Sequence, residues 1–316
     1  MVKILIGSEQ SGSRLDRLLR KRFALLTLSE IYALIRKGKV RIDGKKAKQD
    51  QRLVEGSLLE VDIDPSEETK PSGPDASLKS IVKTDFFRRN FHIIYEDDDL
   101  LACNKPAGLV VHPGTGHLHR DTLIELATGY LIDKGCLKEG DEPALVHRLD
   151  RDTSGVILIA KNKNCVRKLH EIFRSRDIIK QYIALCHHRP PQYEGEIVVG
   201  MARSFENSGT KMKVDEDGQV SKSHYRIVEY NNILSKLEVL LETGKTHQIR
   251  VHLAHIGAPI VGDERYGNPD LDKSVLNRKR NRLYLHSFRI IFNHPVKNRK
   301  ITLEAVEPIE FHDLMK

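Results

Sequence analysis

Apolar positions near the start of the chain recur with the spacing of short amphipathic helices. Leu15, Leu18 and Leu19 share one face of a predicted helix, because residues three and four apart lie one above the other. A second helix is expected to begin after Ser29 and to end at Gly38, since serine caps helix starts and glycine accepts the left-handed conformation at helix ends. The pattern therefore predicts a helical pair at the front of the chain.

The spacing then changes to the alternation that is typical of strands. Residues 40–42 alternate, Asp43-Gly44 is a strong turn signal, and residues 58–61 complete a small sheet. Residues 65–90 lose periodicity and collect proline and glycine among Ser, Glu and Lys, which is the composition of a linker. We expect a small N-terminal α/β domain over residues 1–64, a linker over 65–90 and a larger domain over 91–316.

Strand-like runs alternate with a few helices in the larger domain, which predicts an α+β fold. The candidate strands are residues 93–95, 100–104, 156–160, 182–186, 224–230 and 237–241. The candidate helices are residues 122–131, 166–173 and 246–257.

The charge of the chain indicates a polyanionic partner. Of the net charge of +8, residues 1–62 hold +6, from 14 Lys and Arg against 8 Asp and Glu. An ordinary solvated surface is the alternative explanation of these charges. There is no run of about 18 apolar residues and no signal-peptide pattern, so we expect a soluble cytoplasmic protein that does not bind membranes. The cationic side chains of the two predicted helices are Arg17, Arg20, Lys21, Arg36, Lys37 and Lys39.

Cysteine and histidine spacing does not predict a metal site. The four cysteines lie far apart, without the C-x-x-C spacing of zinc or redox motifs. His112, His117 and His119 share one loop, and His252 and His255 share a predicted helix, but neither group has H-E-x-x-H spacing. We therefore expect neither a metal nor a cofactor.

The densest polar segment follows the apolar residues 144–146. It runs from His147 to Gly155, with the sequence HRLDRDTSG, and leads into a predicted strand. A turn between strands explains such residues without any function, because Asp, Thr and Ser readily bond to nearby backbone. Spacing alone leaves both explanations open.

HRLDRDTSG resembles the signature of RluA-type pseudouridine synthases, and other segments resemble the same family in the same order. They are NKPAGLVVHPGTGH, KQYIAL, ETGKTHQIRVHLAHIGAPIVGDERYG and LYLHSFRIIFNHP. The resemblance spans nearly all of residues 93–308 and implies a pseudouridine synthase fold with a central mixed, largely antiparallel sheet. It also implies that Asp150 is the essential carboxylate, Tyr182 lies beneath the uracil, and Arg250 is the partner of Asp150.

The front module resembles the small RNA-binding domain named after ribosomal protein S-four, through GSRLDRLL, SEIYALIRKGKVRIDGK and VEGSLLEV. Together the two resemblances imply a cofactor-free isomerase that converts uridines to pseudouridines in structured RNA. The combination is most similar to enzymes for large-subunit (23S) ribosomal RNA, in the C and D subgroups, and favours D. We expect a monomer that acts on this RNA or on a large-subunit assembly intermediate.

The residue types suit this chemistry. Asp150 can attack the anomeric carbon or remove the neighbouring sugar proton, and residue types do not choose between these routes. A nearby guanidinium such as Arg250 favours an ionised carboxylate. Tyr182 can stack on the base and accept the carbon-5 proton. Arg148 is the candidate to fill the gap that an extruded base leaves, whereas His147 is expected to shape the turn.

Other functions fit less well. A phosphate-binding loop ending at residues 244–246 would need glycine at Val239. Ser154 lacks the G-x-S-x-G turn of a serine hydrolase, and Asp150 with Asp152 in one turn does not resemble the opposed carboxylates of a glycosidase. A transfer-RNA pseudouridine synthase and a non-catalytic RNA-binding or ribosome-assembly protein remain the alternatives.

Overall fold

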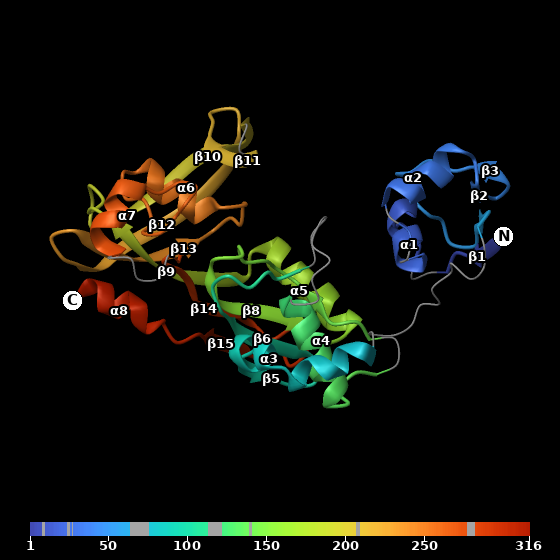
Figure 1. The fold of residues 1–316 in the computed structure, drawn as a ribbon, viewed down its shortest axis with the longest axis horizontal. Helices are drawn as coiled ribbons and strands as arrows, with labels where there is room; N and C mark the ends of the chain where they lie inside the picture. Colours follow the sequence, from blue (N-terminus) through green and yellow to red (C-terminus); the bar gives the residue numbers. More distant parts are fainter. Residues whose placement is uncertain are drawn as a thin grey trace. The chain divides into compact units, whose positions relative to one another are not determined.

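The structure is a computed structural model that describes most of the chain. The described residues are 1–7, 10–23, 26, 28–63, 76–112, 122–138, 141–206, 209–276 and 282–316. The chain divides into two compact units, Met1–Gly73 and Pro74–Lys316 (Figure 1). Each unit has its own buried apolar core.

The front unit combines a four-stranded antiparallel sheet with two helices. The strands in sheet order are β1 (Val2–Leu5), β4 (Leu58–Val61), β2 (Val40–Ile42) and β3 (Lys45–Lys46). The helices are α1 (Leu15–Arg22) and α2 (Leu28–Arg36). Leu15 and Leu19 are buried as the helical spacing predicts, together with Ile31 and Ile35. The predicted helical pair and small sheet are therefore confirmed, whereas β1 was not anticipated.

The two ends of α2 fit the expectation differently. The helix begins at Leu28, so Ser29 lies inside its first turn instead of ahead of it. Gly38 has a φ of 74°, and its N–H donates to the carbonyl of Ile35 at 3.1 Å. The glycine therefore ends the helix in the left-handed conformation that a side chain would strain.

The second unit is built on an 11-stranded sheet. Its strands are β5 (Ile93–Glu96), β6 (Leu100–Lys105), β7 (Ala144–Leu145), β8 (Ser154–Ala160), β9 (Ile178–His187), β10 (Glu194–Glu206), β11 (Gly209–Val214), β12 (Gln219–Tyr230), β13 (Leu234–Leu241), β14 (Leu285–Asn293) and β15 (Lys300–Glu304). The sheet order is β11-β10-β12-β13-β9-β14-β8-β6-β5, with β15 beside β14 and β7 beside β8. Among the strand pairs of the described residues, β14–β8 alone is parallel, so the sheet is mixed and largely antiparallel, as expected.

Helices cover this sheet in two groups. They are α3 (Asp85–Asn90), α4 (Leu123–Asp133), α5 (Lys163–Ser175), α6 (Gln248–His255), α7 (Pro269–Leu276) and α8 (Ile309–Met315). In Figure 1, α4 and α5 lie beside the β6–β8 part of the sheet, and α6 and α7 lie beside the β12–β13 part. All six predicted strands and all three predicted helices of this domain are present. The hairpin of β10 and β11 and the C-terminal strands β14 and β15 were not predicted.

Residues 76–90, which the composition assigns to the linker, are helical in the structure. They form the 3₁₀ helix η2 (Ala76–Lys83) and α3. The backbone of η2 approaches α4 so closely that a Cβ on Gly129 would lie 2.4 Å from the carbonyl oxygen of Leu78. This contact ties residues 76–90 to the second unit. The remaining residues of the expected linker, 65–75, lie outside the described part.

Candidate active site

The turn that carries Asp150 lies between β7 and β8 and rests on a buried lysine. Lys105 is fully buried, and its ammonium donates to the carbonyl oxygens of Pro106 at 2.9 Å, Leu109 at 2.9 Å and Arg151 at 2.7 Å. Burial lowers the pKa of Lys105 to about 7, while three acceptors match its three donors. The lysine therefore joins the end of β6 to the turn beside Asp150.

A close backbone contact fixes the other end of this turn. Gly155, the second residue of β8, has a φ of 114°. A Cβ at this position would lie 2.2 Å from the carbonyl oxygen of Ser287 in β14. Glycine is required here because β8 and β14 approach too closely for a side chain. This close contact between Gly155 and Ser287 holds the Asp150 turn against β14, which is the neighbour of β9 in the sheet.

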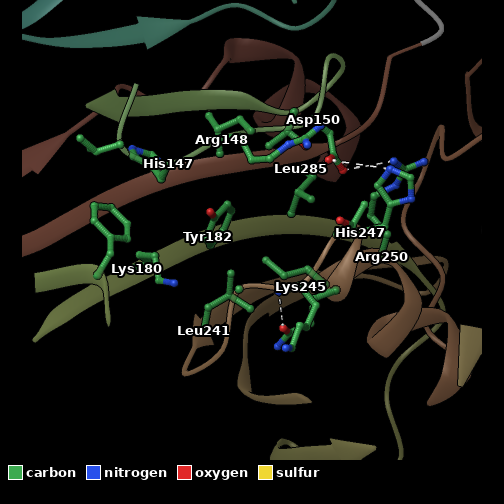
Figure 2. Close-up of a pocket in the computed structure, with 18 residues that line it drawn as sticks. His147, Arg148, Asp150, Lys180, Tyr182, Leu241, Lys245, His247, Arg250 and Leu285 are labelled. Carbon is green, nitrogen blue, oxygen red and sulfur yellow. Dashed lines mark hydrogen bonds and ion pairs between the residues drawn. The ribbon is translucent and has the colours of Figure 1, made fainter. Parts of the chain in front are cut away.

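Arg250 connects Asp150 to a second, buried carboxylate. Its Nη1 donates to Oδ2 of Asp150 at 3.2 Å, and its Nε and Nη2 bind Asp263 in a bidentate pair at 2.7 Å each. Burial opposes the charge of Arg250, but Asp263 and Asp150 outweigh it and raise the pKa of this guanidinium. Asp263 thus fixes the plane of the guanidinium, which leaves Nη1 directed at Asp150 (Figure 2).

His247 also lies close to Asp150, beside Arg250, and was not anticipated from the sequence (Figure 2). Its Nε2 is 3.8 Å from Oδ1 of Asp150, and its Nδ1 is 2.8 Å from the hydroxyl of Tyr266. That hydroxyl accepts the backbone N–H of Met212 at 3.0 Å, so its own proton can be donated to Nδ1. Burial lowers the pKa of His247 against the opposing charge of Asp150. A neutral ring in this arrangement carries its hydrogen on Nε2, towards Asp150.

A cavity of about 310 Å³ opens in front of Asp150. Tyr182 of β9 lines it and is 7% exposed. Burial raises the pKa of Tyr182 to about 12, and the charge of Asp150 adds to this shift. The ring therefore presents a neutral phenol to the cavity near neutral pH. Arg148, Asp150, His247 and Arg250 also line this cavity (Figure 2).

The two residues ahead of Leu149 have different environments. Arg148 is exposed at the cavity and has no ion-pair partner in the described part of the chain. His147 accepts the backbone N–H of Leu158 through Nε2 at 2.9 Å and stacks on Phe173 at 5.1 Å. Burial lowers the pKa of His147 to about 3. His147 thus stays neutral and holds the turn against β8, which is the structural role expected for it.

The predicted RNA-binding residues of the front unit are accessible. Five side chains are exposed, those of Arg17, Arg20, Arg36, Lys37 and Lys39. The side chain of Lys21 lies outside the described part of the structure. Lys39 is 3.5 Å from Asp62, an exposed pair of the kind that contributes little to stability.

The histidine groups of the sequence do not converge in the described residues. His117 and His119 lie outside these residues. His252 is buried and bonds Ser221 at 2.7 Å and Ser223 at 2.6 Å, and burial lowers its pKa to about 4. Both ring nitrogens of His252 are thus occupied by hydroxyl groups of β12.

Among the described residues, one group could bring metal ligands together, formed by Glu196, His224 and Glu242. The ammonium of Lys222 contacts Glu196 and lies 3.3 Å from Glu242. A lysine already compensates this acidic group, so the cluster is satisfied as a surface ion-pair network.

This fold and site define a class of enzyme. A mixed sheet holds a carboxylate, its guanidinium partner and a buried tyrosine around one small cavity. No helix in the described ranges is long and apolar enough to cross a membrane. A carboxylate held by a guanidinium at a cavity that a buried tyrosine lines is an arrangement that suits an enzyme active site.

Comparisons with known proteins identify the family. The RNA pseudouridylate synthase family matches residues 99–255, and the S4 domain matches residues 13–59. The protein named ribosomal large subunit pseudouridine synthase C of Buchnera aphidicola subsp. Acyrthosiphon pisum is 36% identical, over 99% of this chain and 96% of the relative. The protein of the same name from Escherichia coli K12 is 33% identical, over 96% and 92%. The chain belongs to the RNA pseudouridylate synthase family.

A solved structure agrees with this assignment. Human RNA pseudouridylate synthase domain containing 4 is 25% identical and has a TM-score of 0.58, over 75% of this chain and 95% of that chain. The expected fold class and isomerase activity are therefore confirmed. The relatives named here carry the C designation, whereas the sequence favours D within the same pair of subgroups.

Proposed function

We propose that this pseudouridine synthase modifies large-subunit (23S) ribosomal RNA. The observation that carries the proposal is the near full-length match to relatives named ribosomal large subunit pseudouridine synthase C, which extends over the S4 domain as well. These names favour targets of the C type. We also expect the enzyme to act as a monomer in the cytoplasm, where ribosomes are assembled.

Asp150 is proposed as the essential carboxylate of the reaction. The bond between uracil and ribose must break, the base must turn, and carbon 5 must join the sugar. A carboxylate at the cavity can attack the anomeric carbon or remove the neighbouring sugar proton. The contact with Arg250 at 3.2 Å and the nearby His247 orient the carboxylate for either route. The cavity of about 310 Å³ lies at the small end of the range for ligand sites, which suits one extruded nucleotide.

Tyr182 is proposed to hold the detached uracil and to assist loss of the proton from carbon 5. A buried aromatic ring retains a flat base by stacking. The pKa of about 12 keeps the phenol protonated at neutral pH, so Tyr182 can take the proton from carbon 5 only while its own hydroxyl proton passes to another acceptor in the same step. The phenolate form is not required for this role.

The exposed cations are proposed to bind the RNA. The guanidinium of Arg148 is exposed at the cavity, so it can stack on bases or bind phosphate where the target base has left the helix. Arg17, Arg20, Arg36 and Lys37 would contact phosphates through the front unit, together with Lys21 and Lys39.

Mapping of pseudouridines in RNA from cells with and without the gene tests this proposal. We expect specific positions of 23S ribosomal RNA to lose the modification, and a plasmid copy to restore it. A copy carrying Asp150→Asn should not restore it. Loss of pseudouridines only from transfer RNA would refute the proposed substrate, and no loss in any RNA would refute the proposed cellular role.

A further inference from the structure

A second cavity adjoins the catalytic cavity. It has a volume of about 240 Å³ and shares four lining residues with the first, namely Phe173, Lys180, Gly244 and Lys245. The space in front of Asp150 therefore continues between the end of α5 and the loop that follows β13. A nucleotide whose base enters the first cavity would have room for its backbone in the second.

Cationic side chains line this second cavity. They are Arg176, Lys180 and Lys245. Lys180 lies two residues before Tyr182 on β9, so both side chains emerge on the same face of the strand (Figure 2). Arg176 ends α5 in the left-handed conformation, with a φ of 65°. The strand that supplies the tyrosine of the catalytic cavity thus also supplies a cation to its neighbour.

These charges lack matching carboxylates. Lys180 is half-buried, yet neither it nor Arg176 has an ion-pair partner among the residues that the structure describes. Burial lowers the pKa of Lys180, and the charge of Arg176 adds to this effect. Lys245 donates to the neutral amide of Gln219 at 2.6 Å. An unpaired, half-buried cation beside another cation is unfavourable unless an anion joins them.

The one carboxylate lining the second cavity, within the described residues, is already engaged. Glu242 bonds His224 at 2.5 Å and lies 3.3 Å from the ammonium of Lys222. The bond to His224, with smaller contributions from Lys222, lowers the pKa of Glu242. Glu242 is therefore already bound to His224 and Lys222 of β12. A different anion is needed to neutralise Lys180 and Arg176.

We propose that this second cavity binds the phosphodiester next to the target uridine, with Lys180 and Arg176 as its principal ligands and Lys245 at its edge. A guanidinium and an ammonium can together contact the non-bridging oxygens of one phosphate. A Cβ on Gly244 would lie 3.5 Å from Nζ of Lys180. Because glycine lacks this atom, the ammonium of Lys180 stays accessible to a phosphate. The subsite rests on the proposed RNA substrate and places the backbone of the extruded nucleotide.

Binding of unmodified 23S transcript by the full chain at several salt concentrations tests the subsite. Lys180→Gln and Arg176→Gln should each weaken binding about tenfold and reduce the slope of log K against log salt by roughly 0.7–0.9. The double variant should bind more tightly than the product of the two single effects predicts, because both cations contact one phosphate. Lys180→Arg keeps the charge and should retain affinity within about threefold.

Lys83→Gln is the matched control, because it removes one exposed positive charge from η2 outside both cavities. It should leave the affinity and the salt slope unchanged. Far-ultraviolet circular dichroism of every variant checks that the fold is retained. If Lys180→Gln does not fold, the affinity and salt slope of Lys180→Arg test whether a cation at residue 180 contacts RNA.

Two results would overturn the subsite. Lys180→Gln and Arg176→Gln that behave like Lys83→Gln would show that neither cation contacts RNA. Strictly multiplicative effects in the double variant would show two independent contacts instead of one phosphate. If the wild-type protein modifies a different RNA, the proposed substrate fails, and the same series measured on that RNA decides the subsite separately.

Discussion

The two units of the chain use charged side chains in different ways. In the front unit Arg17, Arg20 and Lys37 project into solvent, where charges act over distance and are screened by salt. In the catalytic unit Arg250 and Asp263 are buried and bound to each other through two bonds of 2.7 Å. We propose that the exposed charges attract RNA, whereas the buried and matched charges fix the geometry of the site. Substitutions in the front unit should therefore change RNA affinity and its salt dependence, whereas substitutions in the catalytic unit should change stability and reaction rate.

The largest effect is expected from Asp150→Asn, which removes the charge with almost no change of shape. Isomerisation should be abolished because neither chemical route remains, while affinity for RNA stays within about tenfold, since phosphate contacts supply most of it. Tritium release from uridine labelled at carbon 5 measures the reaction. Turnover by this variant at an appreciable rate would exclude Asp150 as the essential carboxylate.

Asp263→Asn should damage both stability and rate, because it leaves the buried guanidinium of Arg250 without its bidentate partner. Removing one member of a buried pair costs about 3–5 kcal/mol, which urea unfolding can measure. Asp270→Asn is the control, since Asp270 pairs with Lys273 on the surface of α7 and should have no measurable effect. Equal stabilities of the two variants would refute the view that Asp263 fixes the site.

Tyr182→Phe should keep the stacking surface and remove the hydroxyl, so the single-turnover rate should fall by about 10²-fold or more. The pKa of about 12 predicts that Tyr182 causes no change in the rate between pH 6 and pH 10 in the wild-type enzyme. An ionisation in this range that disappears in the variant would contradict the neutral phenol. An unchanged rate would exclude the hydroxyl from the reaction.

Removal of residues 1–73 tests whether the front unit contributes RNA binding and not chemistry. The remaining unit has its own core and should stay folded, bind RNA more weakly and show a shallower dependence on salt. At saturating RNA its single-turnover rate should stay within about tenfold, because the proposed catalytic residues all remain. Unchanged affinity, or a folded unit without activity at saturation, would show that the division of labour is wrong.

The smallest effect is expected from Tyr266→Phe, which removes the hydroxyl that bonds Nδ1 of His247. The rate should fall about tenfold at most, equivalent to one hydrogen bond of about 0.5–1.5 kcal/mol. The hydroxyl of Tyr266 occupies Nδ1, so its removal makes this nitrogen easier to protonate. The pKa of His247, which burial lowers, should therefore rise, and the rate should decline towards acid pH. Nitrogen-15 NMR of the wild-type ring should show hydrogen on Nε2; hydrogen on Nδ1 would contradict the arrangement.

The local elements of the catalytic unit were predictable because their signals are local. Residues 156–160 read as a buried strand, and β8 is buried along its whole length. The helix expected from Thr122 is α4, where Thr122 and Glu125 form a capping box. The segment 76–90 was missed because prolines at positions 65, 71 and 74 precede it and because its own charged residues surround a short apolar face. This face includes Ile81, which is buried, and it is stabilised only by packing against α4.

The residues of the site also fall into two groups, those that the sequence singled out and those that only the structure revealed. Resemblance in the sequence singled out Asp150, Tyr182 and Arg250 and implied their neighbourhood, since each lies in a recognisable segment. His247 and Tyr266 lie in the same recognisable segment as Arg250. The sequence assigned neither of them a role, because their contribution depends on the bond of 2.8 Å that forms between two loops.

By itself the sequence determined many of the strands and helices and the presence of an S4-like front unit, and it singled out Asp150 as the candidate carboxylate. Those properties depend on residue type and on spacing along the chain. Only the tertiary structure decided that Lys180 and Arg176 face one cavity, and that Asp263 orients Arg250 towards a residue 100 positions away. The reason is physical: hydrophobic periodicity determines which face of an element is buried, whereas strand pairing and packing in three dimensions determine which charges meet.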